Sequence, residues 1–209
     1  MFLRPSYKFT ESFTFYIIVI NVILFVIQIL FPPFTDLFAL DPSFALSTRY
    51  YQFITYMFLH GSLIHIALNM FVLAIFGFPL EQTIGRNRFI TVYILSGLGS
   101  AVFYLLMMAS YDISLLGASG GVFGVLAAYA FKYPRQWVYL FGFFPLPASV
   151  LIVFLLIEEM FLGILGLQPG IANFGHVGGI ITGLIVMAYW RLREGKKRSL
   201  PKEFQFVWE

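Results

Sequence analysis

The 209-residue sequence is too apolar for a soluble globular protein, since 60% of its residues are hydrophobic, 11% are charged and its mean hydropathy is strongly positive. A spanning helix needs about 20 residues, so about six crossings fit and we expect one membrane domain over residues 1–209 with no separate soluble domain. The lack of cysteine excludes disulfides and thiolate metal sites. The net charge of +3 is attributed to membrane topology, and no nucleic-acid partner or cofactor is expected.

Long apolar runs predict six helices, near residues 13–31, 60–80, 88–109, 117–132, 147–166 and 173–191. The expected fold class is therefore all-α, a polytopic bundle of six transmembrane helices. No small-x-small cleavage motif closely follows the first run, so we interpret it as a retained helix behind a short N-terminal segment, 1–12. The connection 31–59 is rich in aromatic residues and poor in charge, which suits a segment lying in the headgroup layer.

The lysines and arginines predict the orientation. Alternate connections carry the basic residues Arg4, Lys8, Arg86, Arg88, Lys132 and Arg135, and the tail 191–209 adds more, whereas the other side holds only Arg49. The positive-inside rule then makes both termini cytoplasmic, in a plasma or inner membrane. In this topology the second, fourth and sixth helices begin at the outer face, and their first turns hold a polar set: His60, His65, Asn69, Ser119, Asn173 and His176.

Ser119 and His176 are the candidate catalytic pair. An ionisable residue inside a membrane is a functional candidate by default, and a serine beside a histidine is the pattern of an activated nucleophile. Glycines surround both: Gly117, Gly120, Gly121 and Gly124 on the fourth helix, and Gly175, Gly179 and Gly183 on the sixth. Such small-residue surfaces allow helices to pack closely enough for a hydrogen bond between the two side chains. Helix packing alone would explain the glycines but not the serine and histidine.

His65 and Asn69 are the candidate oxyanion donors, because their i, i+4 spacing places them on one helical face. The backbone N–H of Ser119, at a helix N-terminus, is another candidate donor. His60 precedes His65 by five residues, about 140° around a helix, so we expect it on a different face, holding the first loop.

Acidic residues are not evidently placed to assist His176. No His-Glu-x-x-His motif is present, so a metal site is not expected, and without an orienting carboxylate the economical mechanism is a Ser–His dyad. Glu158 and Glu159 interrupt the fifth apolar run, where they either line a water path or gate near the site or reach the interface on a short or tilted helix. Glu81 is interpreted as a structural hydrogen-bonding residue.

The sequence resembles the rhomboid intramembrane serine proteases over nearly its whole length. The likeness rests on linked motifs in order: 55–61 (TYMFLHG) with His65 and Asn69; Gly77, Pro79, Glu81 and Gly85; Gly117-Ala118-Ser119-Gly120; and Gly175-His176 with Gly179 and Gly183. The resemblance implies a six-helix core, Ser119 as nucleophile, His176 as general base and acid, and His65 with Asn69 in the oxyanion site.

The resemblance also implies details that the residues alone do not. An aromatic platform is expected one turn after the serine, where this chain has Phe123 and many members have Tyr. Implied substrates are single-span membrane proteins cut near the outer face, entering past the fifth helix, with the connection 166–172 as gate and cap. Two rival functions stay open: a non-catalytic rhomboid-like protein that binds transmembrane segments, and a small transporter or channel.

Overall fold

A computed structural model describes residues 9–108, 113–140, 143–167 and 172–198. Its elements in chain order are a 3-10 helix at Phe9–Glu11, α1 (Phe13–Leu30), α2 (Pro33–Phe38), α3 (Pro42–Ala45), α4 (Gln52–Thr55), a second 3-10 helix at Tyr56–Phe58, α5 (Leu63–Ile84), α6 (Arg86–Met108), α7 (Ser119–Lys132), β1 (Trp137–Leu140), β2 (Phe144–Pro147), α8 (Ala148–Leu165) and α9 (Asn173–Arg198).

The long helices α1, α5, α6, α7, α8 and α9 correspond to the six predicted apolar runs. Within the described residues, four of them are long and apolar enough to cross a membrane: α1, α5, α6 and α8. Large apolar side chains such as Leu30, Phe71 and Ile157 remain exposed on these helices, as expected where lipid is the solvent. The predicted helical membrane class is confirmed, and the number of crossings stays a prediction.

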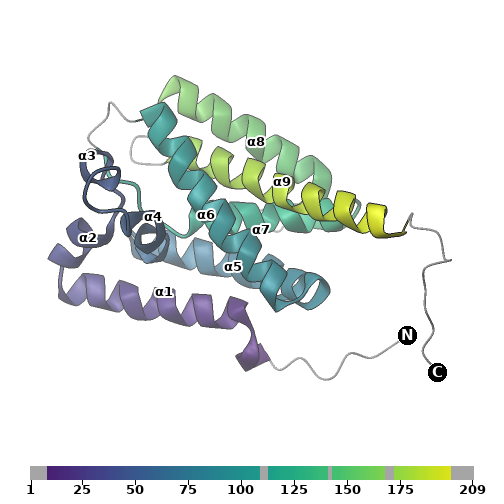
Figure 1. The fold of residues 1–209 in the computed structure, drawn as a ribbon, viewed down its shortest axis with the longest axis horizontal. Helices are drawn as coiled ribbons and strands as arrows, with labels where there is room; N and C mark the ends of the chain where they lie inside the picture. The colour runs from purple at the N-terminus through teal and green to yellow at the C-terminus, as the bar shows by residue number, and fades with distance from the viewer. Residues whose placement is uncertain (1–8, 109–112, 141–142, 168–171, 199–209) are drawn as a thin grey trace.

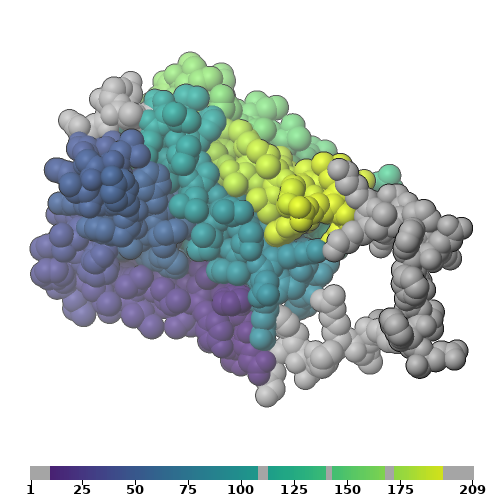
Figure 2. Space-filling view, in the orientation of Figure 1, coloured from purple at the N-terminus to yellow at the C-terminus, as the bar shows by residue number. Residues whose placement is uncertain are grey.

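Helix α7 is largely buried and contacts α5, α6, α8 and α9, and α9 in turn packs against α6, α7 and α8. Figure 1 shows α1 and α8 on opposite sides of the bundle, with α6 crossing diagonally between them. The space-filling view shows the same order, with α6 and α9 together filling the middle of that face (Figure 2). Helices α2, α3 and α4 gather at one end, so the aromatic connection between α1 and α5 covers that end of the bundle (Figure 1).

One end of the bundle, called the basic end here, holds Arg86 and Arg88. Arg86 lies 3.4 Å from Glu11, and Arg88 lies 2.6 Å from Glu194. These ion pairs bring the start of α1, the α5–α6 junction and the end of α9 to one end, as the basic-residue pattern predicts. At the opposite end a backbone bridge joins Leu40 to Leu115. Which end faces the cytoplasm stays a prediction.

Element boundaries differ from the prediction where capping residues decide them. Helix α5 begins at Leu63, not residue 60, because the Ser62 side chain caps it by accepting a hydrogen bond from the His65 N–H. The helix continues through Pro79 to Ile84 and ends at Gly85, whose φ of 89° suits glycine. Helix α9 runs to Arg198, so the first part of the predicted tail is helical.

One element departs from the all-helical expectation. Strands β1 and β2 pair antiparallel between α7 and α8, with Trp137 opposite Pro147 and Leu140 opposite Phe144. Trp137, Tyr139 and Phe144 are exposed on this ribbon. Pro145 and Pro147 lie in one of its two strands, which fits the restriction of proline to edge strands.

Candidate active site

Ser119 is the first residue of α7, and the turn before it requires glycine. Gly117 has a φ of +131° and donates its N–H to the Tyr56 carbonyl oxygen at 3.0 Å. A Cβ at Gly117 would stand 3.0 Å from His65 Nε2 and 3.4 Å from Ser119 Oγ. The missing side chain therefore leaves a small space that the His65 ring and the Ser119 hydroxyl both face.

His176 lies in the first turn of α9, and its Nε2 is 2.9 Å from Ser119 Oγ. The structure thus brings together two residues that are 57 positions apart in the sequence. The His176 side chain is only 12% exposed. A partly buried imidazole at this distance has the geometry to accept a proton from the serine hydroxyl.

Glycine contacts between α7 and α9 produce this approach. A Cβ at Gly179 would stand 2.2 Å from the Gly120 carbonyl oxygen, and one at Gly183 would stand 2.5 Å from that of Gly124. Both obstacles are backbone atoms, so no side-chain rotation could relieve them. The predicted backbone-to-backbone packing of the two helices is confirmed.

Phe123 lies one turn after Ser119 and stacks on the imidazole of His176. Their ring centroids are 4.5 Å apart and their planes differ by 20°. The predicted stacking of this ring on His176 is thus present, and the phenyl group shields one face of the imidazole.

Glu159 supplies the carboxylate that sequence reasoning did not find. Its Oε1 lies 2.9 Å from His176 Nδ1, and its Oε2 accepts a hydrogen bond from Asn173 Nδ2 at 2.7 Å. The expectation that no acid orients His176 is therefore wrong. The contact is made between two helices, by the packing of α8 against α9, so spacing along one helix does not reveal it. The available signal was an acid inside an apolar run.

The two acids of α8 differ in their surroundings. The Glu159 side chain is 11% exposed and contacts His176, whereas Glu158 is half-buried. Glu159 therefore lies at the site, and the two interpretations stay open for Glu158.

His65 and Asn69 are placed together, as their spacing predicts. Asn69 Nδ2 donates to the His65 carbonyl oxygen at 3.0 Å, a bond that engages one of the two N–H groups of the amide. His65 Nδ1 accepts from the Gly61 N–H at 3.4 Å, so a neutral ring carries its proton on Nε2, beside the space left by Gly117. The geometry brings His65 close to Ser119, while Asn69 bonds within its own helix.

His60 does not lie where the helical-wheel argument placed it. Helix α5 begins after it, and its ring packs edge-on against His65 with centroids 5.0 Å apart. Its backbone N–H donates to Gln28 Oε1 at 2.9 Å, and its carbonyl accepts from Gln28 Nε2 at 3.3 Å. These bonds tie the first loop to α1, which is the holding role expected of this position.

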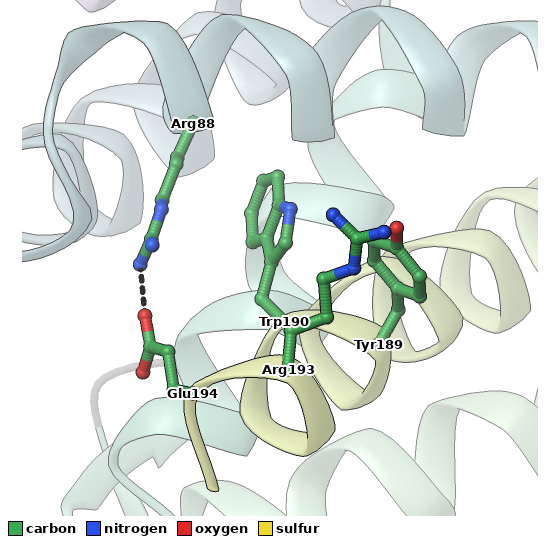
Figure 3. Close-up of a pocket in the computed structure, with 5 residues that line it drawn as sticks. All are labelled: Arg88, Tyr189, Trp190, Arg193 and Glu194. Carbon is green, nitrogen blue, oxygen red and sulfur yellow. Dashed lines mark hydrogen bonds and ion pairs between the residues drawn. The ribbon is translucent and has the colours of Figure 1, made fainter. Parts of the chain in front are cut away.

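Across the described ranges, no group of three or more His, Asp or Glu side chains is arranged to hold a metal ion. A pocket at the basic end is lined by exposed charged side chains, Tyr189 and the half-buried Trp190, with Arg88 over the ring of Trp190 and paired with Glu194 (Figure 3). It contains no serine or histidine and lies at the opposite end of the bundle from Ser119. The expected cap, 166–172, includes residues 168–171, which lie outside the described residues.

The structure thus defines a helical membrane protein in which a serine and a histidine are in hydrogen-bond contact at one end of the bundle. Residues 47–193 match the Rhomboid domain family, and the chain belongs to this family. The resemblance seen in the sequence motifs is thus confirmed.

The curated relatives support this membership. The chain is 36% identical over 133 residues to RHOMBOID-like protein 6, mitochondrial, of Arabidopsis thaliana, a match covering 64% of this chain and 41% of that protein. It is 34% identical over 137 residues to Rhomboid-type serine protease 2 of Emericella nidulans, covering 65% and 26%. RHOMBOID-like protein 12, mitochondrial, of Arabidopsis thaliana is 31% identical over 168 residues, covering 73% and 49%. The chain spans less than half the length of these relatives.

Proposed function

We propose that this protein is an intramembrane serine endopeptidase, with Ser119 as nucleophile and His176 as general base and acid. The observation that carries the proposal is the 2.9 Å contact between Ser119 Oγ and His176 Nε2 at one end of a membrane helical bundle. Similarity to a relative named as a rhomboid-type serine protease supports it.

The reaction begins with proton transfer from Ser119 Oγ to His176 Nε2. The oxygen attacks the carbonyl carbon of a peptide bond, and the C–N bond breaks as the amine leaves with the proton from His176. An acyl-enzyme remains on Ser119. Water, deprotonated by His176, hydrolyses this ester and returns the serine hydroxyl.

The negative charge that develops on the carbonyl oxygen needs donors placed in advance. His65 Nε2 borders the space beside Ser119, and the N–H of Ser119 is unsatisfied by its own helix because it is the first residue of α7. Asn69 retains a second amide N–H for this role. We assign these three groups to the oxyanion site.

The substrates we infer are single-pass membrane proteins that reach the site from the bilayer and are cut near the outer face. The clustering of Ser119, His176 and His65 at one end of the bundle supports cleavage close to a membrane surface, where water is available. The basic residues at the other end support a cytoplasmic position for that end.

The test uses purified protein reconstituted with a panel of single-span proteins, with cut sites mapped by mass spectrometry. Ser119→Ala and His176→Ala are expected to abolish cleavage. Ser47→Ala, which changes an exposed serine, is the matched control and should cleave normally. Undiminished cleavage by either site variant would refute the proposal.

The rival function is a non-catalytic member that binds transmembrane segments, and a serine-directed phosphonate separates the two. The protease should be labelled at Ser119, and Phe123→Leu and His176→Ala should label more slowly. Binding of transmembrane segments without any labelling or cleavage would favour the rival.

A further inference from the structure

We propose that Glu159 is a positioning residue that converts the Ser119–His176 pair into a Ser–His–Glu triad. This inference rests on the proposed function, because it concerns how the same site is prepared for proton transfer. It goes beyond that function in assigning a role to a carboxylate on α8, a helix that holds neither of the two reacting residues.

The three side chains form a continuous chain of contacts. Ser119 Oγ lies 2.9 Å from His176 Nε2, and His176 Nδ1 lies 2.9 Å from Glu159 Oε1. They come from α7, α9 and α8, and Figure 1 shows α8 running beside α9. The side chains of His176 and Glu159 are 12% and 11% exposed, so water has little access to their contact.

The contact fixes which nitrogen of His176 carries the proton. An ionised carboxylate only accepts hydrogen bonds, so Nδ1 must donate to Glu159. A neutral imidazole then presents the lone pair of Nε2 to the Ser119 hydroxyl, as a general base requires. The opposite tautomer would place a proton on Nε2 and block transfer from the serine.

Asn173 and Phe123 hold this arrangement from two further directions. Asn173 Nδ2 donates to Glu159 Oε2 at 2.7 Å, which orients the carboxylate and satisfies its second oxygen. Phe123 stacks on the imidazole at 4.5 Å and limits its rotation. The carboxylate is thus paired on both oxygens, which is what permits a charged group at this depth.

The Glu159 carboxylate also stabilises the product of proton transfer. When His176 takes the serine proton it becomes an imidazolium, and the carboxylate stabilises this cation across the Nδ1 contact. Electrostatic attraction is stronger where water is excluded. Glu159 touches neither the substrate nor the reacting serine, so its effect should fall on kcat and leave KM nearly unchanged.

The experiment compares Glu159→Gln with Glu158→Gln in the full-length protein. The second variant makes the same change on the adjacent residue, whose side chain is half-buried and makes no hydrogen bond to any described residue. Glu159→Gln should lower kcat about 10²- to 10⁴-fold, since an amide can donate to Nδ1 and favour the wrong tautomer. Glu158→Gln should cleave at the wild-type rate. Glu159→Asp, which keeps the charge, should recover part of the loss.

A second readout needs no substrate. In protein labelled with ¹⁵N-histidine, the resonances of His176, assigned by their loss in His176→Ala, report the tautomer directly. The Nδ1-protonated form should dominate in the wild type and in Glu158→Gln, and should lose its dominance in Glu159→Gln. An unchanged tautomer in Glu159→Gln would overturn the proposal, whether or not kcat falls. A fall in kcat without a change of tautomer would mean that Glu159 only supports the structure of the site.

The two readouts separate this inference from the proposed function. If the wild type cleaves nothing, or Ser119→Ala cleaves as well as the wild type, the proposed function fails, and the tautomer still tests the role of Glu159. If the wild type cleaves and Glu159→Gln retains its kcat, the triad fails while the proposed protease stands.

Discussion

The ring of Phe123 lies nearly parallel to the imidazole of His176, at a centroid separation of 4.5 Å. Phe123→Leu should therefore loosen His176 and lower the cleavage rate. Aromatic pairs contribute about 0.5–1.5 kcal/mol beyond their area burial, which corresponds to about a two- to tenfold loss in rate. Phe123→Tyr keeps the ring and should remain close to wild type. Steady-state cleavage of one reconstituted substrate measures both, and equal rates for all three proteins would contradict the platform role.

The contact between Gly179 and Gly120 predicts that adding one methyl group at Gly179 lowers both stability and the cleavage rate. In Gly179→Ala the new Cβ would meet the Gly120 carbonyl oxygen at 2.2 Å, so α7 and α9 must separate. Overpacking costs about 1–3 kcal/mol of stability, and a misplacement of about 1 Å between reacting groups can cost about 10²-fold in rate. Thermal unfolding and cleavage should therefore both fall, with cleavage falling further.

Gly61→Ala is the control for this prediction. Its new Cβ would meet Leu116 Cδ1 at 3.7 Å and His65 Nδ1 at 4.0 Å, both ordinary van der Waals distances, so its thermal unfolding should hardly change. If Gly179→Ala unfolded like Gly61→Ala and cleaved like the wild type, close packing of these two helices would not be what aligns the site.

Substitution of Glu81 by Gln should lower the stability of the protein and leave its activity per folded molecule unchanged. Its buried carboxylate accepts hydrogen bonds from the N–H of Phe13 and from the N–H and hydroxyl of Thr14, at 2.9, 2.9 and 2.7 Å. This confirms the structural role expected of it. In Glu81→Gln an amide nitrogen replaces one carboxylate oxygen, so at least one donor loses its acceptor, at a cost of about 1–3 kcal/mol in the free energy of unfolding.

Glu11→Gln is the matched control, because it makes the same change on an exposed acid at the same end of the bundle. Its ion pair with Arg86 is solvent-exposed, and such pairs contribute at most about 1 kcal/mol. Thermal unfolding in detergent measures both variants. A fall in activity per folded molecule of Glu81→Gln would show that Glu81 acts on the distant site after all.

The burial of His60 should make the stability of the protein depend on pH. Burial, with a smaller contribution from nearby His65, lowers the pKa of His60 from 6.5 to about 3. Between these values the unfolded chain binds a proton that the folded protein does not, so stability falls as the pH drops below 6.5 and continues to fall to about pH 3. At pH 5 the loss from this residue is about 2 kcal/mol relative to pH 7.

Thermal unfolding between pH 7 and pH 5 tests this expectation in the wild type and in His60→Gln. The variant lacks the titrating group, so its stability should depend less steeply on pH, whatever its stability at pH 7. Parallel pH curves for the two proteins would show that His60 does not carry the dependence.

Much of the fold follows from one-dimensional patterns in the sequence. The apolar runs identify the six long helices, because the length and hydropathy of a membrane helix are properties of a continuous segment. The boundaries were less certain, since they depend on local groups such as the Ser62 cap and the glycine conformation at Gly85. The short β ribbon was missed because its aromatic and proline-containing strands lack a clear alternating pattern.

Part of the candidate site could likewise be predicted from the sequence, and part could not. Ser119, His176, His65 and the glycine stripes could be singled out from the sequence, because histidines and small residues in apolar helices are chemically conspicuous. Their local spacing was enough to pair His65 with Asn69 on one helix, and the glycines were enough to predict close packing of α7 against α9.

Only the tertiary structure decided which acid meets His176 and where His60 lies. Glu158 and Glu159 are neighbours of the same type, and the rotation of α8 against α9 alone directs Glu159 to the imidazole. His60 contacts His65 because the chain is not yet helical there. Periodicity along the chain specifies which segments become helices, whereas contacts between helices depend on their relative rotation and depth, which packing of the whole bundle sets.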